Sequence, residues 1–423
     1  MKKLLLATMA LALAGPALAA DPSPQAAPGP LPRATPQSVG LSPERLARIG
    51  AVLGADAAAG QFSGAVVAIA RRGKLAYLEA FGHLDGSRTR PMPRDAIFPL
   101  ASMTKPMAGV ATLLLLEEGK LRLNDPVERF LPALANRRVA VDGNPENTVP
   151  ATRSIRVLDL MRHTSGIMSG AYGTTALHRL LPAGSGVAAQ NFNAESFIQR
   201  MAELPLMYQP GTIWAYGIST DVLGLVAERA SGQRLGALLE QRVFRPLGMA
   251  DTGFLVPEAK HGRYARPLPN DPMGGAAQRV EMGMAPPGFD CGGACAVSTA
   301  GDYLRFAQML ANGGVLEGRR ILSRSTVTEM TRDHMEGIRF PLSERRPYSG
   351  AWGFGLTVAV RREGGAAMLG NAGAWGWDGA YGTAMWVDPR EQLVVVFMAS
   401  IPGQARVHYR ETINALVHQA IVD

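Results

Sequence analysis

The sequence lacks the features that would place it in a membrane or on a nucleic acid. After the N-terminal leader, no apolar run in the 423 residues approaches the roughly 20 residues needed to span a bilayer. The formal net charge is +8, but the surplus is spread along the chain as isolated arginines. We therefore expect no stable membrane insertion and no nucleic-acid partner.

Two common hydrolase motifs are also missing. The chain has no Gly-x-Ser-x-Gly, the sharp turn that presents the nucleophile of α/β-hydrolases. It has no His-Glu-x-x-His either, the pattern that holds zinc in many metalloproteases. A hydrolase of either kind therefore has no candidate residues here, and we expect no metal and no other cofactor.

Cysteine is scarce, and the chain has only Cys291 and Cys295, set four residues apart in Cys-Gly-Gly-Ala-Cys. In an oxidising compartment the two could form a disulfide; the alternative is a pair of reduced residues in a tight turn. The spacing leaves the Cα separation that a disulfide requires undecided. A metal site would need further ligands, and no histidine lies near the pair.

The N-terminus has the pattern of a bacterial secretory signal peptide. Lys2 and Lys3 precede an apolar core at 4–13, and the small residues Ala17-Leu18-Ala19 follow a Gly-Pro break. Residues 20–40 are rich in proline and in small or polar residues, which predicts a flexible linker. We expect residues 1–19 to direct export, so that the protein is periplasmic or secreted, with a catalytic domain at 41–423.

Strand patterns occur at both ends of that domain, with helical patterns between them. A β-hairpin is expected at 64–81, and further strands at 353–360, 382–387 and 392–399. Helices are expected at 41–53, 157–162, 194–202, 220–230, 235–243, 300–310 and 410–421. The order predicts one sheet built from residues 41–103 and 340–423, an inserted helical lobe at 104–339, and an active site where the two meet.

Ser102-Met103-Thr104-Lys105, at the start of the apolar run 106–116, has the spacing of a nucleophile and its base. Side chains three residues apart share one face of a helix, so the Ser102 hydroxyl and the Lys105 amine can meet. An ordinary lysine pKa is about 10.4, so the amine must lose its proton more readily to act as a base. Burial of the helix and the positive end of its dipole both lower the pKa.

Ser-x-x-Lys also arises by chance, often on surface helices. Here the chain has only six lysines, and none besides Lys105 has a serine three residues before it. A lysine followed directly by proline and a buried run is also poorly placed for a solvated face. We therefore favour a catalytic pair.

Five stretches in this order resemble the serine β-lactamase and penicillin-binding-protein superfamily, in particular its class C-like branch, which includes the family VIII carboxylesterases. The resemblance covers nearly all of the chain after the leader and implies an α/β (α+β) fold with an antiparallel sheet flanked by helices. The stretches are Phe98 to Lys105, Leu160 to Gly166, Gln209 to Tyr216, Pro246 to Phe254, and Gly376-Trp377-Asp378-Gly379.

The resemblance assigns roles to further residues. Tyr216 takes the place of the family's tyrosine that shares the general-base work, while the asparagine two residues later is replaced by Ile218, which cannot bond a substrate amide. The backbone N–H groups of Ser102 and Ala380 would form the oxyanion hole. His163 lies in a stretch that the resemblance makes a structural loop.

The family's third element, Lys-Thr-Gly in its penicillin-directed members, is replaced here by Trp377-Asp378-Gly379. These three residues and Ile218 are the candidates for substrate binding. Glycine at 379 would let an edge strand approach the substrate closely. An apolar acyl pocket is expected nearby, and its candidate residues are Met284, Phe289, Trp375 and Tyr381.

These features predict an exported serine hydrolase that cleaves small carboxylic esters through a Ser102 acyl-enzyme, with a small-molecule ester or amide as its partner. The alternatives are a β-lactamase, a D-alanyl-D-alanine carboxypeptidase or a D-aminopeptidase. A non-enzymatic alternative is a silent sensor that binds penicillin or peptidoglycan. Loss of Ser102, Lys105 or Tyr216 would have favoured the sensor, and all three are present.

Overall fold

The computed structural model describes residues 31–340, 351–363 and 368–423. The signal peptide expected at 1–19 and the first part of the linker lie outside these residues. None of the helices in the described ranges combines the length and apolarity that a bilayer crossing requires.

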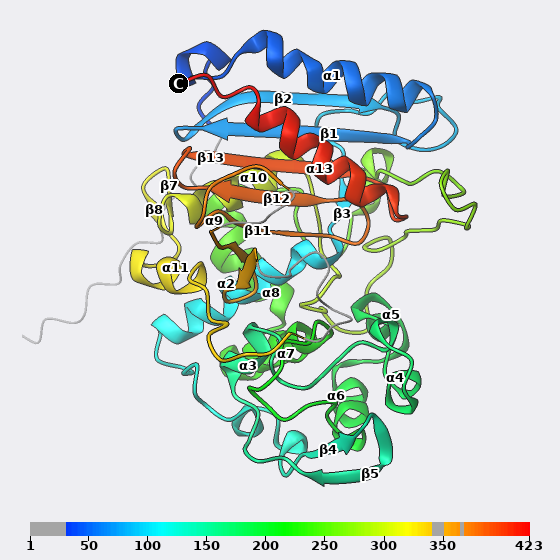
Figure 1. Ribbon diagram of the computed structural model, residues 1–423, viewed down its shortest axis with the longest axis vertical. Coiled ribbons are helices and arrows are strands. Elements are labelled where there is room, and N and C mark those ends of the chain that lie inside the picture. Colours follow the sequence, from blue (N-terminus) through cyan, green and yellow to red (C-terminus); the bar gives the residue numbers. More distant parts are fainter. Residues whose placement is uncertain (1–30, 341–350, 364–367) are drawn as a thin grey trace, which may run out of the picture.

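A seven-stranded antiparallel sheet joins the two ends of the chain, as expected (Figure 1). Its order is β2-β1-β13-β12-β11-β10-β9. The strands are β1 (Gly64–Arg71), β2 (Lys74–Gly82), β9 (Trp352–Phe354), β10 (Ala359–Arg361), β11 (Trp375–Asp378), β12 (Ala384–Asp388) and β13 (Leu393–Ala399). The N-terminal hairpin meets the C-terminal strands where β1 pairs with β13.

The alternating side chains of β1 and β13 supply two separate cores. Val66 lies opposite Met398, and both belong to the larger core, which continues into the helical lobe. Val67 lies opposite Phe397, and both face the smaller core on the other side of the sheet. Because both faces are covered, β13 and all of β1 before Arg71 are apolar rather than alternating with polar residues.

Twelve α-helices are described around the sheet and in the lobe. They are α1 (Pro43–Ala58), α2 (Thr104–Glu117), α3 (Val157–Met161), α4 (Ala176–Leu180), α5 (Ser185–Asn191), α6 (Ala194–Glu203), α7 (Ser219–Ser231), α8 (Leu235–Leu239), α9 (Arg245–Leu247), α10 (Ala300–Ala311), α11 (Arg324–Met330) and α13 (Ala405–His418). α1 and α13 lie together over the smaller core, and α10 packs on β1 and β13 from the other side (Figure 1). α2 packs against α7.

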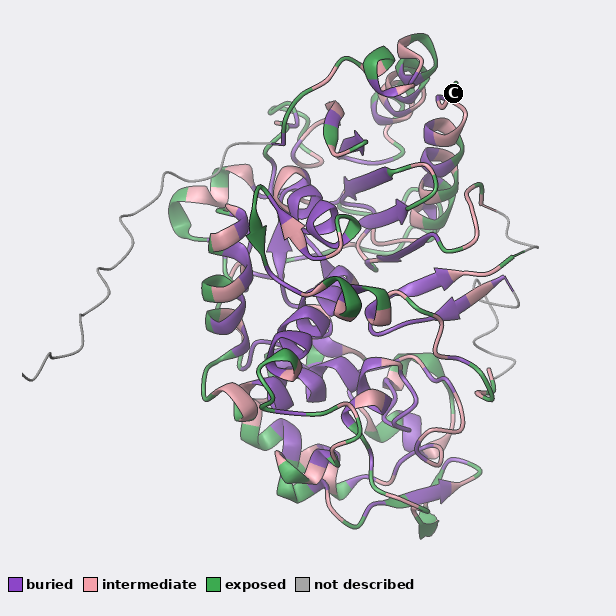
Figure 2. Cartoon of the chain, turned by 90° about the vertical axis from the view of Figure 1, so that its left-hand side faces the viewer, coloured by how far each residue is buried: buried purple, intermediate pink, exposed green. Residues whose placement is uncertain are grey.

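Minor strand pairs are β3 (Phe98–Pro99) with β6 (Val297–Ser298), β4 (Arg138–Val141) with β5 (Asn144–Pro150), and β7 (Val315–Leu316) with β8 (Arg319–Arg320). Short 3-10 turns include η1 (Pro36–Val39), η2 (Ala101–Met103) and η5 (Gly170–Tyr172). Figure 2 shows most strands of the seven-stranded sheet and the central helices as a largely buried body, with exposed residues outside it.

Three expectations about organisation need correction. The stretch 353–360 is two strands, β9 and β10, separated by a turn, and the strand patterns do not include the short strand β11, which only the resemblance implied, as an edge strand. β11 lies between β10 and β12, so it is not an edge strand. α10 packs on the sheet, so residues 300–311 belong with the sheet although they were assigned to the helical lobe.

The predicted linker was wrong over residues 31–40, which pack on the sheet. Leu31 and Val39 are buried, and the backbone of Ala34 donates to the carbonyl of Leu75. Proline and small residues are typical of a linker, but here a few buried apolar side chains and one charged residue attach residues 31–40 to the sheet.

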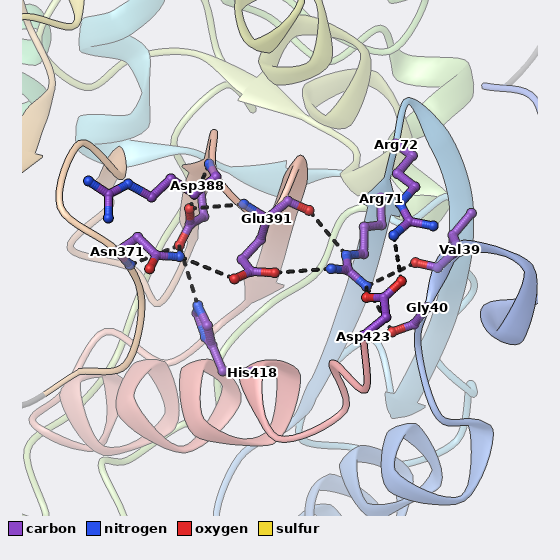
Figure 3. Close-up of polar contacts among 10 residues, drawn as sticks. Val39, Gly40, Arg71, Arg72, Asn371, Asp388, Glu391, His418 and Asp423 are labelled. Atoms are coloured by element: carbon purple, nitrogen blue, oxygen red, sulfur yellow. Dashed lines mark hydrogen bonds and ion pairs between the residues drawn. The ribbon is translucent and has the colours of Figure 1, made fainter.

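That charged residue is Arg71, which is buried at the end of β1 (Figure 3). Its guanidinium donates to the carbonyl oxygens of Val39 and Gly40, at 3.0 and 2.8 Å, and to the carboxylates of Glu391 and Asp423. One buried cation therefore joins η1, the turn after β12 and the residues after α13. A buried guanidinium is tolerated because its donors are paired.

Gly109 in α2 provides a test of this packing. A Cβ at Gly109 would lie 2.2 Å from Oγ1 of the buried Thr357, which is held by bonds to Leu356 and Met161. We expect Gly109→Ala to lower the free energy of unfolding by about 1–3 kcal/mol, although alanine favours helix. Gly54→Ala in α1, where nothing lies within 4 Å of the added Cβ, should raise it by up to about 1 kcal/mol. Urea unfolding followed by circular dichroism measures both, and stabilisation by both substitutions would contradict the packing.

Candidate active site

Ser102 lies in η2, in the 3-10 turn immediately before α2 rather than in the first turn of the α-helix itself. The preceding residue, Ala101, has a φ of +48°, a backbone conformation that residues other than glycine seldom adopt. Hydrogen bonds hold it from both sides: Thr104 Oγ1 donates to the Ala101 carbonyl at 2.7 Å, and Thr383 Oγ1 donates to the Leu100 carbonyl at 2.9 Å. The serine is therefore fixed by both the helix and the sheet.

Lys105 lies one turn along and is almost fully buried, with 2% of its surface exposed. Its Nζ donates to Ser102 Oγ at 3.2 Å and to the Gly293 carbonyl at 2.7 Å. It also lies over the ring of Tyr216, 4.7 Å from the centroid. The spacing of three residues thus brings the amine to the hydroxyl, as expected.

Burial lowers the pKa of Lys105 to about 8, and the charge of Asp221 is the largest of the influences that oppose the shift. Desolvation penalises the ammonium form, whereas a nearby carboxylate favours it. About a tenth of the amine is then unprotonated at pH 7 and about half at pH 8, and this fraction can accept a proton. The pKa of Lys105 is therefore lowered, as the sequence predicted, and burial is the cause.

Tyr216 completes a triangle around Ser102. Its hydroxyl donates to Ser102 Oγ at 2.7 Å. Burial raises its pKa, against the effect of hydrogen bonding with Ser102 and Trp377, so the phenol keeps its proton at neutral pH. The ring is packed among Trp214 at 6.0 Å and Trp377 at 5.4 Å between centroids.

His163 belongs to the same aromatic cluster. Its ring lies 4.7 Å from that of Tyr216, and burial followed by the charge of Lys105 holds its pKa well below the usual range. A neutral ring packed on aromatic neighbours fits the structural role expected for the loop that contains it.

A cavity of about 270 Å³ opens beside Ser102. It is lined by Ala101, Ser102, Lys105, Ser169, Tyr172, Ala183, Gly184, Ser185, Gly186, Val187, Gln190, Tyr216, Gly217, Ile218, Met282, Ala294, Ala380 and Tyr381. Both residues expected to supply the oxyanion hole, Ser102 and Ala380, are among them. Ile218 also borders it, but its side chain is 1% exposed and joins the larger core.

Trp377, Asp378 and Gly379 were expected to bind substrate, but none of them lines this cavity. Trp377 is buried behind Tyr216. The Asp378 carboxylate is paired with Arg410 at 2.9 Å. A Cβ on Gly379 would lie 2.1 Å from the Leu100 carbonyl, so glycine there allows β11 to approach the backbone beside the nucleophile, not the substrate.

Of the apolar candidates, only Tyr381 lines the cavity. Phe289 stacks on Phe197 at 4.8 Å, and Met284 and Trp375 pack in other parts of the core. Tyr172, Val187 and Met282 supply apolar surface instead. Their segments have no sequence signature that distinguishes a cavity wall from an ordinary loop.

The structure joins Cys291 and Cys295 in a disulfide with a Cα separation of 5.3 Å, which settles the open alternative. The loop that they close contains Gly293, whose carbonyl accepts from Lys105. Sequence reasoning missed both Gly293 and Asp221, because the residues that they contact in the site lie far away in the sequence. In the described residues, no cluster of three or more histidine, cysteine, aspartate or glutamate side chains has the arrangement of a metal site.

Comparisons with known proteins agree with the family resemblance found in the sequence. A family model described as Beta-lactamase matches residues 49–419. The chain is similar to an uncharacterised protein of Mycobacterium tuberculosis (strain CDC 1551 / Oshkosh), at 35% identity over 80% of this chain and 86% of that protein. It is similar to Esterase EstB of Burkholderia gladioli, at 32% identity over 80% of this chain and 86% of the relative.

Among solved structures, it is similar to EstCE1, described as a hydrolase with promiscuous acyltransferase activity. The two superimpose with a TM-score of 0.73 at 25% identity, over 89% of this chain and 99% of EstCE1.

The lowered pKa of Lys105 predicts a pH profile. If the amine takes the proton of Ser102, kcat/KM for any substrate should fall about tenfold per pH unit below a midpoint near 8 and level off above it. The sign follows because protonation removes the base. Initial rates between pH 5.5 and 9.5 measure the midpoint; a value near 10.5, the ordinary lysine value, would contradict the buried, unprotonated base.

Proposed function

From the premise that the chain belongs to the beta-lactamase family, we propose that it is an exported serine hydrolase that cleaves small carboxylic esters through an acyl-enzyme on Ser102. A carboxylesterase-like serine hydrolase agrees with its relatives, and the antiparallel, helix-flanked sheet agrees with its structural neighbours. The observation that carries the proposal is the triangle in which Ser102 Oγ lies within hydrogen-bonding distance of both Lys105 Nζ and Tyr216 Oη, at the wall of a cavity.

In the first step, unprotonated Lys105 accepts the hydroxyl proton of Ser102, and Oγ forms a bond to the ester carbonyl carbon. The carbonyl electrons move onto oxygen, and the N–H groups of Ser102 and Ala380 stabilise that oxyanion. Tyr216 donates a hydrogen bond to Ser102 Oγ in the resting site. Since its pKa is raised, Tyr216 acts as a proton donor rather than as the first base.

In the second step, the carbonyl re-forms and the bond to the leaving alcohol breaks. Tyr216 supplies a proton to the departing oxygen and regains one from the Lys105 ammonium, which restores the base. Water then repeats the sequence: it gives a proton to Lys105, attacks the acyl carbon and releases the acid, while Ser102 recovers its proton. An alcohol that reaches the acyl-enzyme first would accept the acyl group by the same route. EstCE1 is described as a hydrolase with promiscuous acyltransferase activity.

The cavity favours neutral substrates. Among the described residues that line it, Lys105 has the only cationic side chain, and its Nζ is committed to Ser102 and Gly293. The nearby Arg410 is paired with Asp378. Ile218 offers no polar group to a substrate amide. A substrate carboxylate would therefore lose its water without gaining a free cationic partner in this lining, and a substrate amide would find no partner at the position of Ile218.

The proposed place of action is the periplasm or the exterior of the cell. The pattern at 1–19 supports export. The bond between Cys291 and Cys295 is compatible with an oxidising compartment, where such bonds persist.

Substrate preference is the first test. We expect kcat/KM on p-nitrophenyl butyrate to exceed that on nitrocefin by at least about tenfold to hundredfold, because each polar group buried without a partner costs about 1–3 kcal/mol. Nitrocefin handled as well as the ester would favour the β-lactamase alternative. Cleavage of D-amino-acid amides in preference to both would favour the peptidase alternatives, and a folded protein inert to all three would favour the sensor.

Substitution of the base is the second test. Lys105→Arg keeps the charge, but a guanidinium does not release its proton at working pH, so we expect kcat/KM to fall by about 10²–10⁴-fold. The matched control is Lys120→Arg at a partly exposed lysine paired with Glu118, which should leave the rate unchanged. If Lys105→Arg retained the wild-type rate, Lys105 would be an electrostatic residue and not a base.

A further inference from the structure

The loop closed by Cys291 and Cys295 connects Lys105 to a carboxylate that the proposed mechanism does not use. Gly293 lies at the centre of the loop, and both of its backbone polar groups are hydrogen-bonded. Its carbonyl accepts from Lys105 Nζ at 2.7 Å, and its N–H donates to Asp221 Oδ1 at 3.0 Å. Lys105 and Asp221 therefore both hydrogen-bond to the same short loop.

Asp221 occupies a position on α7 where an apolar side chain would be usual. It is fully buried, and its second oxygen, Oδ2, accepts from Ser185 Oγ at 2.6 Å. A buried carboxylate is costly unless its oxygens are paired, and here both are. Ser185, at the start of α5, lines the cavity beside Ser102. The carboxylate thus links α7, α5 and the disulfide-closed loop.

The loop fits this place closely. A Cβ on Gly293 would lie 2.2 Å from Ser185 Oγ and 2.6 Å from Asp221 Oδ2. A Cβ on Gly292 would lie 2.4 Å from the carbonyl of Thr220, on α7. Any larger residue at either glycine would push the loop off α7 and carry the Gly293 carbonyl away from Lys105.

We propose that Asp221 is a positioning residue: it holds the Gly293 peptide against Lys105, and its negative charge sets the pH range in which Lys105 can take the proton of Ser102. The inference rests on the proposed function for the role of Lys105. Asp221 itself does not line the cavity, so it acts through Gly293 and through its charge rather than by touching substrate.

The charges support this coupling. Burial raises the pKa of Asp221 to about 6, and Lys105 is the largest influence in the opposite direction. In turn, Asp221 is the largest influence that raises the pKa of Lys105 against burial. At pH 7 the carboxylate is therefore mostly ionised and favours the ammonium form of the lysine.

Other groups also face Lys105 from the surrounding elements. Tyr172 and Asp378 act on it in the same direction as Asp221, but more weakly. The ring of Tyr216 lies beneath the amine, and His163 is neutral. Of the acidic groups, Asp221 alone shares a hydrogen-bonding partner with Lys105 among the described contacts.

Asp221→Asn tests the charge while keeping the shape. The amide can still accept from the Gly293 N–H and can donate to Ser185. Loss of the anion destabilises the ammonium form, so the pKa of Lys105 falls. The acid limb of the kcat/KM profile for p-nitrophenyl butyrate should therefore move to lower pH by about half a unit or more. A residue with only a structural role would lower the rate equally at every pH without moving the midpoint.

Asp302→Asn is a matched control. Asp302 is another acidic residue with its pKa raised to about 6 by burial, and it also accepts from one backbone N–H, that of Asp251, and one hydroxyl, that of Thr252. Lys105 is not among the groups that act on it. Its substitution should leave the midpoint at the wild-type value.

Two further measurements keep the result decisive. If Asp221→Asn does not fold, Asp221→Ser removes the same charge with a smaller polar side chain and should move the midpoint in the same direction. If the wild type hydrolyses no ester, the proposed function fails, and Lys105 is titrated directly by NMR of its labelled Cε. The six lysines give few signals, and Lys105→Arg identifies the one of interest.

The pKa of Lys105 should be lower in Asp221→Asn than in the wild type in that titration as well. If the wild type is active and Asp221→Asn leaves the midpoint of its pH profile unchanged, the inference is overturned while the proposed function stands. The inference is likewise overturned if the NMR titration gives the same pKa for Lys105 in Asp221→Asn and in the wild type.

Discussion

Lys105 is buried at the point where α2, Tyr216 and the disulfide-closed loop meet, and the arrangement of the site depends on how that ammonium group is tolerated. A buried lysine is destabilising when charged, so the site must either pair it or let it lose its proton. Here both occur: the Gly293 carbonyl and Ser102 accept from Nζ, while burial lowers the pKa to about 8. The same burial that the fold must tolerate makes the amine a usable base.

The sheet keeps the nucleophile in place from the other side. Thr383 donates to the Leu100 carbonyl, and Gly379 lets β11 approach that carbonyl without a clash. Arg410 holds the carbonyl of Gly379 and pairs with Asp378, so α13 supports the end of β11. Residues between 378 and 410 thus fix the turn near residue 100 that carries the nucleophile.

Much of the fold and of the catalytic site could be predicted from sequence, because the strongest signals are short spacings and continuous apolar runs. Ser102 and Lys105 are three residues apart, and the buried strands β1 and β13 are almost continuous apolar runs. Tyr216 required the family resemblance, since nothing in its own segment points at Ser102. Asp221 and Gly293 could not be found, because their contacts depend on how α7 and the loop pack. β11 escaped because its four residues, Trp-Gly-Trp-Asp, have no extended alternating pattern.

The central claim is that Ser102 is the nucleophile, and covalent labelling tests it most directly. The folded protein is exposed to a fluorophosphonate near pH 8.5, its intact mass is measured, and the modified residue is located by peptide mapping, with Ser102→Ala in parallel. The account predicts one adduct, on Ser102, and none on the variant. An adduct on another serine, or a folded wild-type protein that takes no label, would contradict it.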